Sequence, residues 1–251
     1  MKAFMEKHPF WFALGFTVIV LQLLGLIVVV VGARVLGFPM LPMRVMAALV
    51  TTIVPLVYIW RVGWWQDVGF VSTTQNVYAL TLPLVLIFFP MVFFGSAGTP
   101  TQELNIFLVA VFLTGLSEEA IFRDLFIRAF LPQGKWRAVL LSSLLFGGAH
   151  IVQSFGVGMT MQDNVVQMAN AFLGGILMTS VRLRVNNLWP LIIIHTLEDY
   201  FWIIAGFTTG VHDLSEISLS LYVIKWALEI ITAVYLMRQP ATATIDGQPV
   251  G

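Results

Sequence analysis

Long apolar runs alternate with short polar stretches along almost the whole chain. A helix needs about 20 mainly apolar residues to cross the hydrocarbon core of a bilayer. The stretches between the runs are rich in Gly, Pro, Asn and charged residues, which favour turns. We therefore predict an all-α, polytopic membrane protein with about eight transmembrane helices, of which the second is the shortest. Their predicted positions are 10–31, 45–60, 78–95, 105–127, 138–157, 165–181, 188–206 and 219–237.

No soluble domain, internal repeat or low-complexity linker interrupts this pattern. The run 10–31 is too long for the core of a signal peptide, and no small-residue cleavage site follows it. We expect it to stay in the protein as a spanning helix. Residues 1–251 should therefore form a single transmembrane domain, ending in a flexible polar tail at 238–251.

The composition agrees with a membrane protein. Hydrophobic residues make up 59% of the chain and charged residues only 10%, whereas soluble domains carry about 25% charged residues. The formal net charge is zero, so nothing indicates a nucleic-acid partner and we expect none. The chain has no cysteine, which excludes disulfides and thiolate chemistry.

Lys and Arg residues are distributed unevenly between the two predicted sides of the membrane. The odd-numbered connections carry only Arg34 and Arg44. Cytoplasmic loops are enriched in Lys and Arg, so we expect both termini in the cytoplasm, in a bacterial or archaeal plasma membrane. The N-terminus, the even-numbered connections and the C-terminal end carry nine: Lys2, Lys7, Arg61, Arg128, Lys135, Arg137, Arg182, Arg184 and Arg238.

Ionisable residues inside the predicted spans need a specific explanation. A charge at the centre of a bilayer costs about 2.5–3.5 kcal/mol on insertion scales, and such groups usually face the bundle interior and serve a function. Three pairs at i, i+4 spacing have a simpler interpretation as ion pairs on one helix face: Lys225 with Glu229, Asp124 with Arg128, and Glu119 with Arg123. The remaining candidates are Glu118, His150, His195, Glu198 and Asp199.

Glu118 has no such partner, because the residue four positions further on is Phe122. Its charge must be balanced from another helix. At 1.5 Å per residue, Glu118 lies about 15 Å, His150 about 20 Å and His195 about 12 Å from the polar end of its own run. Asp199 shares a helix face with His195. These side chains can therefore converge on one polar cavity inside the bilayer, with a catalytic core at about 105–206.

Three short motifs in this core resemble those of a known family. EEAIFR (118–123), FGGAH (146–150) and HTLED (195–199) are similar to the E-E-x-x-x-R, F-x-x-x-H and H-x-x-x-[N/D] motifs of the CAAX-prenyl-protease and bacteriocin-processing (CPBP, or Abi) family. The resemblance implies an eight-helix intramembrane endopeptidase whose site opens toward the cytoplasm.

The resemblance also implies roles for individual residues. Glu118 would activate a water molecule with the help of His150, and His195 and Asp199 would complete the site. Glu119 and Arg123 would support it. The motif does not require Glu198, which lies about 100° around the helix from Asp199. A serine mechanism is disfavoured, because Ser117 and Glu118 are sequence neighbours and do not face each other on a helix.

The sequence does not distinguish a hydrolytic mechanism that uses a metal ion from one that does not. Glu118, His150, His195 and Asp199 are suitable zinc ligands, but the chain has no H-E-x-x-H motif, and a water mechanism without a metal needs the same residues. Asp199 suits metal ligation or the orientation of His195 better than oxyanion binding, because a carboxylate donates a hydrogen bond only when protonated.

Two other functions compete with proteolysis. Intramembrane acids and histidines also form proton relays in ion- or proton-coupled transporters, although the chain shows no internal repeat. A non-catalytic scaffold or immunity protein could use the same pocket only for binding. For an endopeptidase, the expected partners are the lipid bilayer and a membrane-associated peptide or protein. The resemblance allows a prenylated C-terminal peptide, a peptide leader, a pheromone precursor or an anti-sigma factor.

Overall fold

The computed structural model describes residues 2–65, 68–71, 73–98, 100–152, 160–206, 217, 219–239, 244–245 and 248–249. Helices dominate these residues, as predicted, and the two strands are only two residues long. The short helix α1 (Lys2–Lys7) comes first, and strands β1 (Thr244–Ile245) and β2 (Gln248–Pro249) come last. Within the polar tail predicted at 238–251, residues 240–243, 246–247 and 250–251 lie outside the described residues.

Of the four N-terminal helical segments of the bundle, all but the second are built from several pieces. The first contains α2 (Pro9–Phe16), the π-helical η1 (Thr17–Leu24), α3 (Gly25–Val29) and η2 (Val30–Val35). The second is α4 (Met40–Arg61). The third contains η3 (Val77–Leu80), α5 (Thr81–Leu86) and α6 (Phe89–Phe94). The fourth contains α7 (Thr101–Ala120), the π-helical η4 (Ile121–Leu125), α8 (Phe126–Phe130) and η5 (Leu131–Gln133).

The four C-terminal segments follow. They are α9 (Lys135–Ala149) with η6 (His150–Val152), α11 (Met161–Val185), α12 (Trp189–Ile204) and α13 (Leu219–Arg238). Each of the eight segments overlaps a predicted one, although 153–157 of the prediction 138–157 lie outside the described residues. Six segments are long and apolar enough to cross a membrane. The others, α9 and α12, have 15 and 16 residues. The protein is an integral membrane protein, but the count of eight spans is not confirmed.

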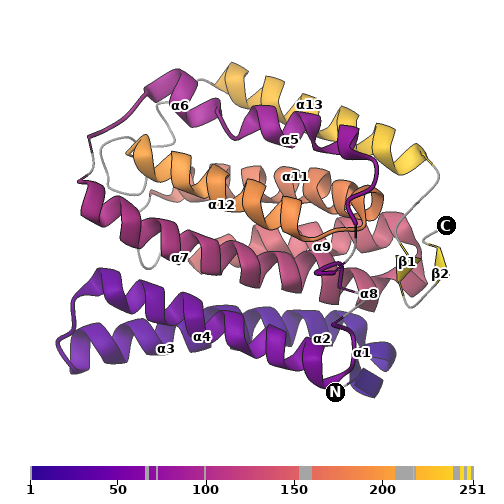
Figure 1. The fold of residues 1–251 in the computed structure, drawn as a ribbon, viewed down its shortest axis with the longest axis horizontal. Coiled ribbons are helices and arrows are strands. Elements are labelled where there is room, and N and C mark those ends of the chain that lie inside the picture. The colour runs from indigo at the N-terminus through magenta and orange to yellow at the C-terminus, as the bar shows by residue number, and fades with distance from the viewer. Residues whose placement is uncertain are drawn as a thin grey trace.

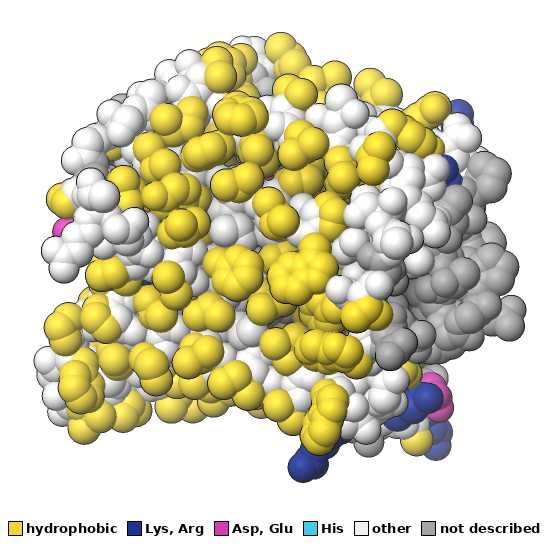
Figure 2. All heavy atoms as spheres, in the orientation of Figure 1, with side chains coloured by type: hydrophobic (Ala, Val, Ile, Leu, Met, Phe, Trp, Pro, Cys, Tyr) yellow, Lys and Arg dark blue, Asp and Glu magenta, His cyan; other side chains and the backbone are white. Residues whose placement is uncertain are grey.

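Successive segments run in alternating directions, so that both chain ends lie at the same end of the bundle (Figure 1). Apolar side chains cover much of the visible face, and Lys and Arg side chains gather toward the end that carries the termini (Figure 2). Large side chains such as Ile19, Val92 and Ile231 are 62–73% exposed. A surface of this kind is stable in hydrocarbon, whereas a soluble protein rarely exposes such an area.

Small residues bring the helices of the core close together. A Cβ atom on Gly147 of α9 would lie 2.8 Å from the carbonyl oxygen of Met168 on α11. At Gly115 of α7, the hydroxyl of Thr196 on α12 would be 3.1 Å from an added Cβ. By contrast, an added Cβ on Gly148 would meet open space. Close approach at Gly147 and Gly115 therefore places α9 and α12 against their neighbours near the candidate residues.

A π-helical turn follows the paired glutamates of α7. η4 contains Arg123 and Asp124, and the hydroxyl of Ser142 on α9 donates a hydrogen bond to the carbonyl oxygen of Phe122 within it. Such turns inside α-helices often occur at functional sites. In α8, which follows this turn, Phe126 and Phe130 are fully buried. The turn therefore separates the candidate site from a tightly packed apolar layer.

Candidate active site

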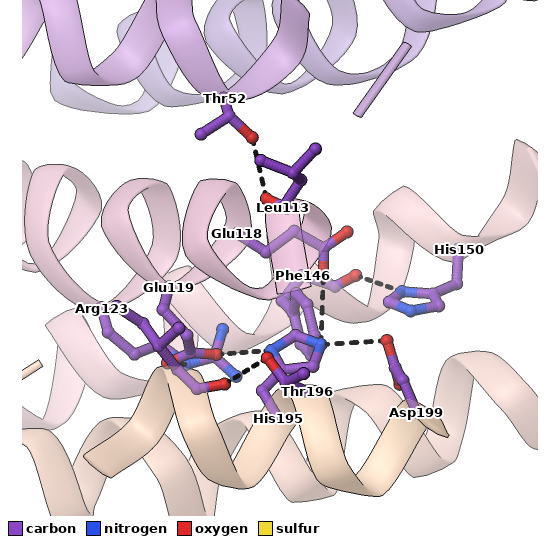
Figure 3. Close-up of polar contacts among 11 residues, drawn as sticks. Thr52, Leu113, Glu118, Glu119, Arg123, Phe146, His150, His195, Thr196 and Asp199 are labelled. Carbon is purple, nitrogen blue, oxygen red and sulfur yellow. Dashed lines mark hydrogen bonds and ion pairs between the residues drawn. The ribbon is translucent and has the colours of Figure 1, made fainter. Parts of the chain in front are cut away.

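The imidazole of His195, on α12, is the centre of the candidate site (Figure 3). Its Nδ1 lies 2.8 Å from Oε1 of Glu119. Its Nε2 lies 3.5 Å from Oε2 of Glu118 and 3.6 Å from Oδ2 of Asp199. Glu118 and Glu119 come from the end of α7, so side chains far apart in the sequence meet at one ring.

Hydrogen-bond chemistry constrains the protons at this ring. An ionised carboxylate only accepts hydrogen bonds, so Nδ1–H of His195 donates a hydrogen bond to Oε1 of Glu119. Nε2 then faces two more carboxylates, Glu118 and Asp199. A nitrogen and a carboxylate oxygen attract each other only when one of them carries a proton, so Nε2 and these two carboxylates can share one. The arrangement can both accept a proton from water and donate one to a developing oxyanion.

Glu119 supports the ring rather than facing the cavity. Its side chain is fully buried, and its second oxygen lies 3.4 Å from Nε of Arg123, one helical turn further on. The guanidinium of Arg123 lies over the ring of Phe146, 4.2 Å from its centroid. The predicted i, i+4 pair therefore forms, and Glu119 also orients His195, which its sequence spacing did not indicate.

His150 stands apart from this cluster. Its Nδ1 lies 2.9 Å from the carbonyl oxygen of Phe146. A carbonyl oxygen only accepts, so Nδ1 donates, and in the neutral ring Nε2 carries the free lone pair. The ring of Phe146 packs edge-on against both His150 and His195, with centroids 5.0 Å and 6.0 Å away. Among the described residues, no hydrogen bond or ion pair joins His150 to the three acids, although all of them line one cavity.

The cavity has a volume of about 1140 Å³. The exposed fraction of the side chains rises from 0% for Glu119 and 11% for His195 to 21% for Glu118 and 39% for Asp199. The last two therefore present their oxygens to the cavity. Arg34 and Arg44 also line it, and they belong to the end of the bundle opposite the termini (Figure 1).

Glu198 lines the same cavity one helical turn after His195. It makes no hydrogen bond or ion pair with the described part of the chain. The other predicted ion pairs form away from the cluster. Lys225 Nζ lies 2.6 Å from Oε1 of Glu229, and Arg128 Nε lies 3.1 Å from Oδ2 of Asp124.

Two imidazoles and two carboxylates have the right chemistry for zinc, and Glu119 resembles the outer carboxylate that often orients a zinc-bound histidine. The positions of these side chains suit a metal ion less well than their chemical types do. Within the described ranges, no group of three or more His, Asp or Glu side chains is placed to hold a metal ion. We therefore derive no step through a metal.

Sequence reasoning missed the residues that hold His150. Nε2 of Gln22 donates to the carbonyl oxygen of Ala149 at 2.8 Å, and Nδ2 of Asn164 lies 3.3 Å from the carbonyl oxygen of His150. Gln22 is the one amide side chain within the apolar run 10–31. That isolated polar residue was an available signal, because an amide in hydrocarbon needs a partner.

Residues 100–201 match the family described as type II CAAX prenyl endopeptidase Rce1-like. The matched segment contains α7, η4, α8, α9, α11 and most of α12, and it includes all seven candidate residues. No curated protein and no solved structure matches the chain. Helices outside the segment, among them α4 and the helix that carries Gln22, also line the cavity.

Proposed function

We propose that this protein, whose residues 100–201 match the type II CAAX prenyl endopeptidase Rce1-like family, is an intramembrane endopeptidase acting on a membrane-associated or lipidated peptide or protein. One observation carries the proposal. Carboxylate oxygens of Glu118 and Asp199 lie 3.5 and 3.6 Å from the same nitrogen of His195, on the wall of a cavity of about 1140 Å³ within an apolar bundle. This arrangement suits the activation of water better than simple binding.

The proposed reaction uses Glu118 as the general base. Glu118 takes a proton from a water molecule as the water oxygen attacks the peptide carbonyl carbon. The shared proton on Nε2 of His195 stabilises the oxyanion that forms, while Glu119 holds the ring in place. Glu118 then passes its proton to the leaving nitrogen as the C–N bond breaks, so the products are a carboxylic acid and an amine.

His150 and Asp199 complete this scheme. The free Nε2 of His150 can accept a hydrogen bond from the attacking water and fix its direction. Asp199 retains the shared proton near His195, and its greater exposure places it beside the incoming substrate.

The decisive experiment replaces Glu118 by Gln, which keeps the size and removes the base. General bases contribute about 10²- to 10⁴-fold, so the variant should lose at least that factor in kcat while remaining folded in the membrane. Glu103→Gln is the matched control, because Glu103 is an exposed acid in the first turn of the same helix. Mass spectrometry of membrane peptides from cells expressing each form gives the cleavage products.

Treating the purified protein with a zinc chelator extends the test. The metal-free scheme predicts unchanged hydrolysis, whereas loss of activity that returns on adding zinc would replace it with a metal mechanism. Products that persist in Glu118→Gln cells would refute the endopeptidase proposal. Proton flux in proteoliposomes without any hydrolysis would favour a transporter, and an unchanged cellular phenotype in a Glu118 and His195 double variant would favour a scaffold.

A further inference from the structure

A second polar cluster lies where α11 meets α13, outside the group of acids around His195. Nζ of Lys225 lies 2.6 Å from Oε1 of Glu229, one helical turn further along α13, and 2.8 Å from Oδ1 of Asn170 on α11. Nε1 of Trp226 lies 3.4 Å from the same amide oxygen. The side chains of Lys225 and Glu229 are each 2% exposed, so their charges are shielded from water and balance each other.

The chemistry of the two donors fixes the orientation of the Asn170 amide. Lysine and tryptophan side chains only donate hydrogen bonds, so the amide oxygen must face α13 and the amide NH2 group must face away from it. Asn170 lines the cavity, whereas Lys225 and Trp226 do not. The amide therefore turns its two N–H donors toward the cavity. Among the described residues, no hydrogen bond uses either donor.

The ion pair serves the oxygen end of this amide and leaves the nitrogen end free. The second oxygen of Glu229, Oε2, is buried and accepts no hydrogen bond within the described part of the chain, so Glu229 does not take up the donors of Asn170. Buried ion pairs often stabilise a protein no more than apolar residues of similar volume would. Holding Asn170 in one orientation gives the pair of Lys225 and Glu229 a role that packing alone does not.

Asn170 lies close to the level of the candidate site along α11. Five residues further on, a Cβ atom added to Gly175 would lie 3.2 Å from the ring of Phe146, against which both site histidines pack. Six residues earlier, Nδ2 of Asn164 lies 3.3 Å from the carbonyl oxygen of His150. These separations are about 7.5 and 9 Å along a helix. The free N–H donors therefore face the cavity between these two levels.

The substrate of the proposed endopeptidase carries the matching group, because a buried peptide needs partners for its carbonyl oxygens. We infer that the NH2 group of Asn170 binds a backbone carbonyl oxygen of the peptide substrate away from the scissile bond, and that Lys225 is the positioning residue for this amide. Gln167, three residues earlier on α11, also lines the cavity and makes no hydrogen bond or ion pair with described residues, so it can extend the subsite. The peptide nature of the ligand rests on the proposed function.

The test uses a synthetic peptide that covers the cleavage site found by mass spectrometry, and analogues in which sulfur, a weaker acceptor, replaces one carbonyl oxygen at a time. With the wild-type protein, one analogue altered outside the scissile bond should raise KM about 2- to 10-fold, the factor that one hydrogen bond contributes. Its kcat should not change, because the contact is the same in the ground state and the transition state. In Asn170→Leu, KM for the oxygen peptide should already be raised by this factor, and the same analogue should raise it no further.

Gln162→Leu is the matched control, because Gln162 is an exposed amide in the first turn of the same helix and does not line the cavity. This variant should respond to every analogue as the wild-type protein does. Independent changes combine additively, so additive effects of Asn170→Leu and sulfur on KM would overturn the contact. An unchanged KM in Asn170→Leu, or a loss in kcat alone, would also overturn it.

Lys225→Met combined with Glu229→Gln tests the positioning role without leaving an unpaired charge in the core. The Asn170 amide is then free to turn, so KM should rise by up to about tenfold with kcat unchanged. A lower unfolding temperature with unchanged KM would leave the pair a purely structural role and overturn this part of the inference.

Failure of the inference and failure of the function give different results. If hydrolysis depends on Glu118 but KM is the same in Asn170→Leu as in the wild-type protein, the function stands and the inference fails. If the products persist in Glu118→Gln cells, the proposed function fails, and the inference fails with it because its ligand comes from that function.

Discussion

At His195, one imidazole meets three carboxylates that differ in their surroundings. Glu119 is fully buried and bonded at 2.8 Å, whereas Glu118 and Asp199 lie at 3.5 and 3.6 Å and are partly exposed. Hydrogen bonds shorter than about 3.2 Å hold a side chain firmly, and longer contacts leave room for movement. Glu119 is therefore the positioning residue, and the other two acids face the chemistry.

Glu119→Gln should lower kcat by about 10- to 100-fold, as loss of a carboxylate that orients a functional histidine does. Gln keeps an oxygen that can accept from Nδ1, so the protein should still fold. Asp124→Asn is the matched control, since Asp124 is a fully buried acid paired with Arg128 on the same helical segment. Thermal unfolding measures the effect on stability, and single-turnover hydrolysis measures the effect on the rate of the chemical step. Equal losses of kcat in both variants would contradict a positioning role for Glu119.

At the level of elements, one hydrogen bond between described residues joins the first helical segment to the end of α9. Gln22 donates to Ala149, directly before His150. A comparable bond joins α4 to α7, where the hydroxyl of Thr52 donates to the carbonyl oxygen of Leu113 at 2.8 Å. Bonds between helices in membranes contribute about 0.6 kcal/mol each on average, so neither bond alone decides whether the bundle folds.

Gln22→Leu should therefore cost about 0.6 kcal/mol of stability and yet lower kcat by up to about 10²-fold, because a shift of about 1 Å in a catalytic group has that effect. Thr52→Val removes a bond of the same kind away from the histidines and should leave kcat unchanged. Hydrolysis rates and unfolding in detergent measure the two quantities. If Gln22→Leu and Thr52→Val changed stability and kcat by the same amounts, Gln22 would have only a structural role.

Across the described residues of the whole molecule, the bundle is tightly packed toward the end that carries the termini, and its cavity lies toward the other end. The tightly packed end contains the buried phenylalanines of η4 and α8 and the ion pair of Asp124 with Arg128. The cavity is walled by small and apolar residues such as Ala47 and Ala48. We therefore expect the width of the cavity between the first helical segment, α4 and α7 to control access to the site.

Ala47→Phe should narrow this route and lower kcat/KM by at least about tenfold, in the range seen when a pocket loses space for part of its ligand. The ring would project into the cavity, so the unfolding temperature should not fall. Leu144→Phe is the control, because Leu144 is 56% exposed on the outer surface of α9. Substrate titrations of both variants give the measurement, and an unchanged kcat/KM for Ala47→Phe would place the route elsewhere.

The positions of the helices could be predicted closely. The third segment was expected at 78–95 and occupies 77–94, and the last was expected at 219–237 and occupies 219–238. These limits depend on local properties, namely apolar length and turn-forming residues. The ends of α12 at Trp189 and Ile204 are nearly as expected too, but its 16 residues do not decide by themselves whether it spans the bilayer.

The sequence by itself determined the membrane class, the helical segments, the pairs at i, i+4 spacing and the residue types available for hydrolysis, because each depends on neighbours within a few positions. Only the tertiary structure decided that Glu119 holds His195, that Gln22 braces the backbone at His150 and that the cavity leads away from the termini. These features depend on how helices distant in sequence rotate and pack against one another, and short-range periodicity carries no record of that rotation.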